Sequence, residues 1–232
     1  MSWSQAVIVF FIENLIVWFL GLMFGRLLQK IFYHRRTTSL PLHIFSTHIA
    51  LELKLSFWAI LSNTCITLFG YQLWLLNILQ IQSFQFRLMD FIEIFLLIFV
   101  IDLLMFLLHK LAHHPVLFHK VHSLHHKFTQ PTSITLYSLH PLENLAFGLL
   151  ILSVFTAYSF NWVAIIFYLT LNVVFGIIGH CGVEPIPDSW KHIFPLKYIA
   201  NGKFHIDHHE TPNTNYGFYT NIWDRLFKTT KF

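Results

Sequence analysis

Five long apolar stretches run through this chain, and each is long enough to cross or enter a membrane as a helix. They cover about 5–25, 55–79, 91–108, 143–159 and 162–179. The last two are separated only by a short Ser-Phe-Asn connection, which predicts a helical hairpin. Only 11% of the residues are charged, whereas soluble domains carry about 25%. We therefore predict an all-α integral membrane protein with about four to five transmembrane helices.

The positions of Lys and Arg predict how these helices are oriented. All of them except Arg87 lie between the first and second stretches, between the third and fourth, or after the fifth. Because cytoplasmic loops carry an excess of Lys and Arg, we expect the N-terminus outside and the C-terminus in the cytosol. No Lys or Arg precedes the first stretch and no small-residue cleavage site follows it, so it reads as a retained helix. Residues 109–142 and 180–232 are then expected on the same, cytosolic face.

Charge and cysteine content argue against two classes of protein. The net charge is +4, but the basic residues are scattered beside apolar stretches and form no stripe, so we expect no nucleic-acid partner. Cys65 and Cys181 are too few for a disulfide framework or a Cys-rich zinc site. The 16 histidines, in contrast, outnumber the 11 acidic residues. Histidine is the commonest metal ligand, so this excess points to a metal site.

Three short histidine boxes fall on the predicted cytosolic face. The first is an HxxxH pair, His109 and His113, which follows the third stretch. The second and third are HxxHH boxes. Their members are His122, His125, His126, His205, His208 and His209. Residues three or four apart share one face of a helix, so each box is expected to present its imidazoles together.

His140 and His180 stand alone, at the start of the fourth stretch and the end of the fifth, and bring the candidate metal ligands to ten. A structural zinc uses four ligands and a catalytic zinc about three. So many ligands therefore favour two metals. Imidazole ligands suit iron, copper, zinc or nickel and exclude calcium and magnesium. The competing interpretation is a tag remnant or structural histidines, and three boxes in order on one predicted membrane face argue against it.

The boxes resemble those of the fatty acid hydroxylase/sterol desaturase superfamily of membrane di-iron oxygenases. The resemblance begins at Asp102 and runs through HKLAHHPVLFHKVHSLHHKFTQP to SLHPLEN. It resumes at GHCG, around His180, and ends with NGKFHIDHHETPNTNYGFYTNIWDRLF. Within the superfamily the chain is most similar to sterol C-5 desaturases, on the boxes, Pro131, His140-Pro141 and the NYG…WDR sequence after the third box.

The second box departs from the wording usual in that superfamily. It reads HSLHH instead of HKxHH, and an additional His119 creates a competing HKVH sequence. The distances along the chain to His113 and His140 favour His122, His125 and His126 as the box.

The resemblance implies an O₂-dependent lipid oxidoreductase with two irons, which zinc can replace in purified protein. It implies desaturation or hydroxylation of a sterol-like lipid at an unactivated C–H bond. An external electron donor of the cytochrome b5 or ferredoxin type is expected, because the sequence shows no flavin, NAD or haem motif. Residues 1–100 are expected to form N-terminal transmembrane helices and 101–232 the catalytic region. The protein is expected in the endoplasmic reticulum of a eukaryote or the inner membrane of a bacterium.

Carboxylates are expected around the histidines, because they orient metal-bound imidazoles through the other ring nitrogen. Asp102 and Asp207 are the candidates, with Asp102 inside the third stretch, where a carboxylate is costly and usually functional. A helix-packing hydrogen bond is the alternative for Asp102, and an ordinary surface acid for Asp207 and Asp224. Glu143 fits either the site or a helix N-terminus.

The remaining histidines lie outside the boxes or beside them. His114 and His119 are expected to be outer-shell or interfacial groups rather than ligands. His34, His43, His48 and His192 are expected at the membrane interface.

Two other functions remain open on the residues alone. Hydroxylation of a fatty acyl chain, sphingoid base or alkyl lipid uses the same chemistry on another lipid. A histidine-rich membrane metal transporter or a zinc hydrolase belongs to a different class. Transporter sites lie near the bilayer midplane, whereas these histidines cluster at and beyond the ends of the apolar stretches.

Overall fold

The computed structural model describes residues 1–37, 48–128 and 132–231, and this part of the chain is helical with no strand. The predictions for Pro131 and His43 lie outside the described residues. Every predicted apolar stretch corresponds to a helix. These helices are α1 (Trp3–Ile31), α2 (Ile49–Leu75), α3 (Leu88–Ala112), α6 (Pro141–Ala157) and α7 (Trp162–His180). The all-α prediction is therefore confirmed.

Four of these helices, α1, α2, α3 and α7, are long and apolar enough to cross a membrane. The fifth, α6, has 17 residues and is shorter than the others. Large apolar side chains of α1, such as Ile8, Phe19 and Leu20, are more than half exposed. Contiguous apolar surface of this kind is rare on soluble proteins and is expected where lipid is the solvent.

Local sequence signals set where the helices begin. The Ser2 hydroxyl accepts a hydrogen bond from the Gln5 backbone amide, and the Gln5 side-chain oxygen accepts one from the Ser2 backbone amide, which makes a capping box for α1. Asn161 caps α7 by accepting from the Ala164 amide. Pro141 is at the first position of α6, where its missing N–H costs nothing.

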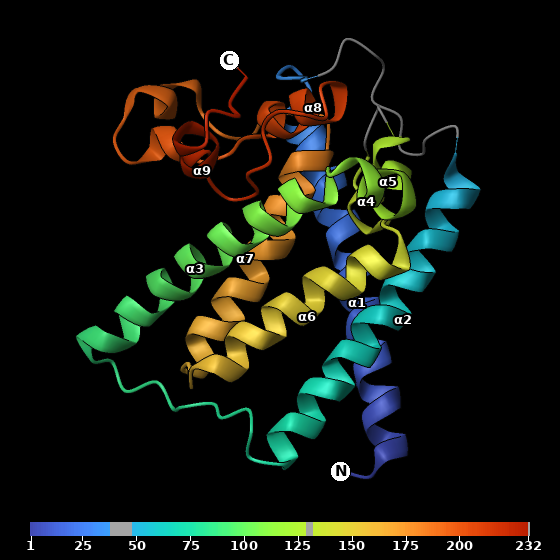
Figure 1. The fold of residues 1–232 in the computed structure, drawn as a ribbon, viewed down its shortest axis with the longest axis vertical. Helices are drawn as coiled ribbons and strands as arrows, with labels where there is room; N and C mark the ends of the chain where they lie inside the picture. Colours follow the sequence, from blue (N-terminus) through green and yellow to red (C-terminus); the bar gives the residue numbers. More distant parts are fainter. Residues whose placement is uncertain (38–47, 129–131, 232) are drawn as a thin grey trace.

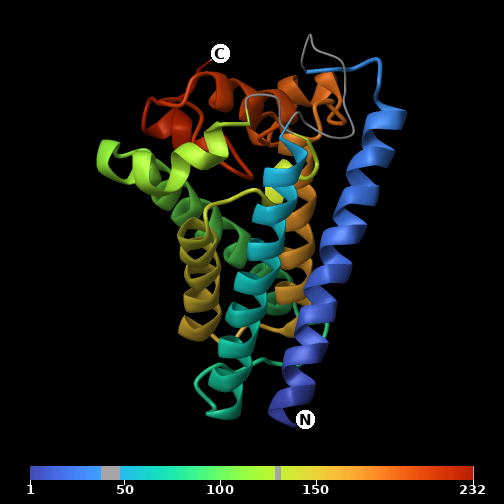
Figure 2. The same ribbon diagram turned by 90° about the vertical axis from the view of Figure 1, so that its right-hand side faces the viewer.

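The long helices form one bundle whose two ends differ (Figures 1 and 2). Helix α2 packs against α1 and α6, and α3 packs against α6 and α7. The connection between α6 and α7 is short, so the predicted hairpin is present. The N-terminus lies at one end of the bundle and the C-terminus at the other.

The short helices gather at the C-terminal end of the bundle and form a cap (Figure 1). They are α4 (Pro115–Leu117), the π-helical turn η1 (Phe118–His122), α5 (Ser123–His126), α8 (Gly202–Glu210) and α9 (Ile222–Leu226). Two of these segments, 113–126 and 202–226, are far apart in the chain and meet over the ends of α3 and α7. This juxtaposition creates the candidate site.

Candidate metal centre

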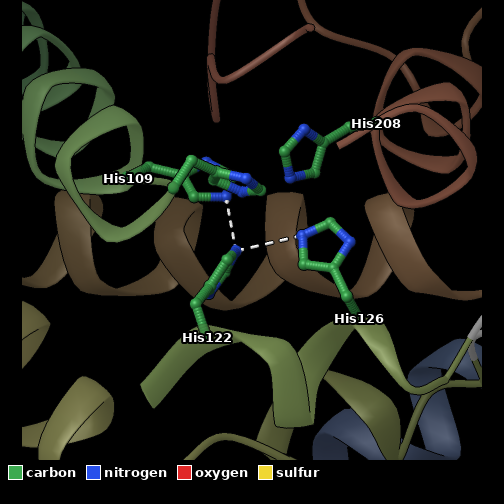
Figure 3. Close-up of side chains that lie close together, drawn as sticks. His109, His122, His126 and His208 are labelled. Carbon is green, nitrogen blue, oxygen red and sulfur yellow. Dashed lines mark hydrogen bonds between the residues drawn. The ribbon is translucent and has the colours of Figure 1, made fainter. Parts of the chain in front are cut away.

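Nine histidines converge in two groups under the cap. Cluster A consists of His109, His113, His122, His126 and His208. Cluster B consists of His125, His180, His205 and His209. Within each cluster one ring nitrogen of every member lies within 4.8 Å of the others, and all nine side chains are buried. Figure 3 shows four members of cluster A pointing toward a common centre.

Each HxxHH box contributes to both clusters. In the second box, His122 and His126 belong to cluster A and His125 to cluster B. In the third box, the assignment is reversed, with His205 and His209 in cluster B and His208 in cluster A. Histidines four apart thus stay together, and the one between them turns to the neighbouring cluster.

The two adjacent His-His pairs bring the clusters side by side. The ring centroids of His126 and His208 are 4.7 Å apart in cluster A, and those of His125 and His209 are 4.7 Å apart in cluster B. Across the boundary, His126 and His209 are separated by 4.9 Å. This spacing fits two neighbouring metal ions.

Helix ends place these side chains. The first box occupies the last turn of α3, with His113 as its C-terminal cap, and His180 is the last residue of α7. The second box begins in η1 and continues into α5, and the third lies in α8, which Asn201 caps. Gly179 lets α7 approach α8 closely, because a Cβ there would lie 3.1 Å from the ring of His205.

Oxygen acceptors outside the clusters fix how several of the rings are protonated. In cluster A, Nδ1 of His109 lies 2.8 Å from the Tyr216 carbonyl oxygen, and Nδ1 of His208 lies 2.6 Å from that of Thr214. In cluster B, Nδ1 of His180 lies 2.7 Å from the Gly176 carbonyl oxygen. A carbonyl only accepts, so these rings carry their proton on Nδ1 and point the Nε2 lone pair inward.

Glu143 provides the charged member of this outer layer. Its Oε1 lies 2.6 Å from Nδ1 of His122, and both side chains are buried. A carboxylate bonded to the outer nitrogen of an imidazole fixes the ring and raises its basicity as a ligand. Glu143 was expected either at the metal site or as an acid at a helix N-terminus. Its hydrogen bond to His122 supports the metal site.

The geometry inside the clusters fits a cation. The Nε2 atoms of His109 and His122 lie 3.2 Å apart, although both rings donate through Nδ1 and so present lone pairs to each other. Nε2 of His113 and Nε2 of His208 are buried with no hydrogen-bond partner among the described residues. Two ligands on one metal at about 2.05 Å are separated by about 2.9 Å at a right angle and about 3.4 Å at the tetrahedral angle. The observed Nε2 separations in the two clusters, 3.1–3.4 Å, lie in this range.

The cluster histidines outside the long helices are neutral, as metal ligands must be. Burial, reinforced by the neighbouring imidazoles, lowers the pKa of His113 to about 2 and that of His126 to about 3. The same causes lower the pKa of the other cluster histidines in this region. They are His122, His125, His205, His208 and His209. Iron, zinc and other metals that accept imidazole nitrogen suit this ligand set.

The structure places three predicted site residues away from the clusters. Nδ1 of His140 accepts a hydrogen bond from the Leu142 amide and caps α6, so His140 joins neither cluster. Asp207 pairs with Lys203 at 2.8 Å on the outside of α8. Asp102 hydrogen-bonds to no histidine among the described residues. The sequence pattern placed these residues near the boxes, but it carries no information about the direction of their side chains.

Asp102 instead fastens α3 to the C-terminal part of the cap. Its carboxylate accepts from the amides of Tyr219 and Thr220, from the Thr220 hydroxyl at 2.5 Å and from the Trp223 indole at 3.0 Å. These contacts match the alternative role for Asp102, which is a hydrogen bond that holds packed helices together.

Asp224 does not lie on the surface. It is fully buried and accepts from the amides of Tyr216 and Gly217. It therefore holds the backbone that receives the hydrogen bond from His109.

Five histidines that were not expected to be metal ligands lie outside the clusters. They are His34, His48, His114, His119 and His192, and all are exposed. None of these belongs to either group of nitrogens that converge.

Comparison with known proteins connects this centre to a family. The sequence profile described as fatty acid hydroxylase matches residues 94–229, which include every histidine of both clusters. The match covers more than half of the chain. The chain belongs to the fatty acid hydroxylase family. The expected superfamily is thereby confirmed.

Proteins similar to this chain are named for several different activities. A Delta(7)-sterol 5(6)-desaturase of Leptosphaeria maculans is 28% identical over 59% of this chain and 36% of its own length. Methylsterol monooxygenase 1 of Danio rerio is 31% identical over 53% of this chain and 42% of its own. A very-long-chain aldehyde decarbonylase, GL1-6 of Oryza sativa subsp. indica, is 31% identical over 56% and 21%. The similarity to sterol-modifying relatives is therefore confirmed.

The chain thus spans less than half the length of these curated relatives. No solved structure matches it significantly. The four long apolar helices indicate a membrane protein.

Proposed function

We propose that the chain is an O₂-dependent di-iron oxidoreductase that desaturates or hydroxylates a sterol-like lipid. One observation carries the proposal: two adjacent clusters of buried, neutral histidines with inward-facing Nε2 atoms. Five and four ligands suit two metals and exceed what one metal uses. When bound, two irons would supply the O₂ chemistry at an unactivated C–H bond that no side chain can provide.

The residues of the chain would hold and insulate this chemistry. His109, His113, His122, His126 and His208 would bind one metal, and His125, His180, His205 and His209 the other. Glu143 would orient His122 and offset part of the metal charge. The cap formed by 113–126 and 202–226 would exclude bulk water from the reacting atoms.

The supporting parts of the proposal concern membrane, domains and partners. Residues 1–100 would anchor the chain in several passes, and 101–232 would form the catalytic region with the histidine clusters on the cytosolic face. The enzyme would reside in the endoplasmic reticulum of a eukaryote or the inner membrane of a bacterium. A one-electron donor of the cytochrome b5 or ferredoxin type would supply reducing equivalents, because hydroxylation and desaturation with O₂ both consume two electrons from outside the substrate.

A second candidate is hydroxylation of a fatty acyl, sphingoid or alkyl lipid. The family description and the very-long-chain aldehyde decarbonylase among the relatives favour it. It requires the same metal centre and differs only in the lipid.

Turnover of iron-loaded protein with candidate lipids, followed by mass spectrometry of the products, tests the proposal. A new sterol double bond or sterol hydroxyl group is the expected result, and a hydroxylated acyl chain would support the second candidate. Zinc can replace iron in purified protein, so metal content is measured after expression with iron and with zinc. One zinc per chain, independent of iron supply, would contradict the di-iron proposal.

A further inference from the structure

A row of aromatic rings leads from the surface of α9 to cluster A. The ring of Phe227, which is 46% exposed, stacks on the fully buried ring of Phe106 with a centroid distance of 5.3 Å. Phe106 lies 6.3 Å from Tyr216. The ring of Tyr216 then lies 5.1 Å from that of His113, and its carbonyl oxygen accepts from Nδ1 of His109. Each ring is thus in contact with the next from the surface to two members of cluster A.

A buried redox centre needs a route of this kind. The histidines of both clusters are buried, so a protein that docks on the cap cannot touch them. Electron tunnelling falls off steeply with distance through empty space and more slowly through bonded or closely packed groups. Tyr216 meets cluster A in both ways, because its ring contacts the ring of His113 and its carbonyl oxygen accepts a hydrogen bond from His109.

The surface where the row ends is basic around an apolar centre. Four consecutive exposed residues occupy it, Arg225, Leu226, Phe227 and Lys228. Nζ of Lys110 lies 5.1 Å from the centroid of Phe227. We call these five residues the α9 surface.

Two exposed cations of the α9 surface, Lys110 and Lys228, carry its positive charge, whereas Arg225 is engaged by the Asn221 side chain and the Tyr198 ring. No salt bridge joins Lys110 or Lys228 to a carboxylate in the part of the chain that the structure describes. Asp224, the neighbouring acid, is fully buried and accepts from Tyr216, Gly217 and the Thr229 hydroxyl. An apolar centre with charges at its rim is the usual anatomy of a protein interface.

We propose that the α9 surface docks an acidic one-electron carrier protein and that electrons pass from it through Phe227, Phe106 and Tyr216 to cluster A. The inference rests on the proposed function, because only a redox-active centre needs this supply. Redox complexes are small and transient, and opposite charges speed their formation. A few lysines and arginines around one exposed ring suit such a contact.

The electron balance is simple. Each encounter oxidises the carrier by one electron and reduces the metal centre by one electron. Two encounters supply the two electrons that O₂ chemistry on the lipid consumes, and two protons from water complete the balance.

The experiment compares two reductants on the full chain, loaded with iron and held in lipid nanodiscs. The first is the reduced soluble haem domain of cytochrome b5, an acidic one-electron carrier, whose oxidation is followed by its own absorbance in a rapid-mixing instrument. The second is dithionite, which is small and needs no docking surface. Binding of the carrier to metal-free protein is measured in parallel, so that docking has a readout independent of the metal.

Charge reversal tests docking and ring removal tests the path. The double variant Lys110→Glu, Lys228→Glu is expected to slow carrier oxidation about tenfold or more at low salt and to remove most of its salt dependence. Phe106→Leu is expected to slow electron transfer while leaving carrier binding unchanged. The matched control Lys120→Glu changes an exposed lysine of η1 at the same end of the molecule and is expected to leave both unchanged. Dithionite should reduce every variant at the rate of the unmodified protein.

Three outcomes would overturn the inference. Carrier oxidation by the double variant at the unmodified rate would show that docking occurs elsewhere. A spin label on Leu226→Cys that is relaxed by lipid-dissolved oxygen, and not by an aqueous nickel chelate, would show that the α9 surface is seated in the membrane. A centre that dithionite cannot reduce would contradict the proposed function itself, which distinguishes that failure from a failure of the docking surface alone.

Discussion

The Nδ1 atom of His122 lies 2.6 Å from Oε1 of Glu143. Within the described part of the chain, Glu143 is the carboxylate that hydrogen-bonds a cluster histidine. The pair joins η1 in the cap to the first turn of α6 in the bundle. A negative charge at this position belongs to the centre electrostatically, because the imidazoles themselves are neutral.

Replacement of Glu143 is expected to weaken metal binding. Glu143→Gln keeps an acceptor but removes the charge, and we expect about tenfold lower metal affinity; Glu143→Ala removes both and approaches about 100-fold. Competition with a metal chelator, read by elemental analysis, measures the change. Glu13→Gln, an exposed acid of α1, serves as the control. Unchanged metal affinity in Glu143→Ala would contradict the role assigned to this carboxylate.

The division of the third box predicts different losses from two neighbouring residues. His208→Ala removes a ligand from cluster A and His209→Ala one from cluster B. Each is expected to roughly halve the bound metal and to abolish lipid oxidation, because both metals are needed. Metal analysis after gel filtration, with a spectroscopic signature for each site, measures the result.

Three further histidine variants serve as comparisons in that experiment. His125→Ala should behave like His209→Ala, since both belong to cluster B. His34→Ala and His140→Ala should retain full metal content, because neither residue joins a cluster. Loss of metal in His140→Ala, or full activity in His208→Ala, would contradict the ligand assignment.

Asp102 is expected to stabilise the attachment of the cap. Asp102→Ala leaves four buried or partly buried donors of 219–223 without this acceptor, and should lower the free energy of unfolding by about 2–4 kcal/mol. Asp102→Asn keeps one acceptor oxygen and should cost about 1 kcal/mol. Detergent-induced unfolding and limited proteolysis of 211–231 measure both effects. Asp188→Ala, which removes the two ion pairs of an exposed carboxylate, should change stability by less than about 0.5 kcal/mol.

The metal-free protein is expected to lose stability in acid. Burial holds the pKa values of His113, His126 and the other cluster histidines of the cap below the value of about 6.5 expected in an unfolded chain. Between the two values the unfolded state binds more protons than the folded state, so stability is complete above about pH 6.5 and falls as the pH falls toward the folded pKa. Thermal unfolding at about pH 7.5, 6 and 5 tests this, and a flat profile would contradict it.

Bound metal should change that profile. A metal competes with protons for the same nitrogen atoms and binds only the folded state, so the metal-loaded protein should remain stable at a lower pH than the metal-free form. Acid should then release metal and stability together. Release of metal well before unfolding would indicate a centre that does not support the cap.

The sequence by itself determined the class of the fold and the histidines that gather in the candidate metal centre. Long apolar stretches have one stable form in lipid, a helix that satisfies its own backbone, and this rule needs no tertiary information. The spacing of the boxes and the distribution of lysines and arginines likewise predicted that residues 109–142 and 180–232 lie at one end of the bundle. All nine histidines of the two clusters were among the ten candidates.

Only the tertiary structure decided how those histidines divide and which carboxylates support them. Periodicity places His122, His125 and His126 on one helix face, but the approach of α8 and α7 determines that His125 turns to cluster B. Asp102 and Glu143 look alike as buried acids on apolar helices. One meets donors from residues 219–223 and the other meets His122, because these contacts join segments far apart in the chain. Local pattern carries no information about such partners, which is why His140 appeared to be a ligand and is instead the cap of α6.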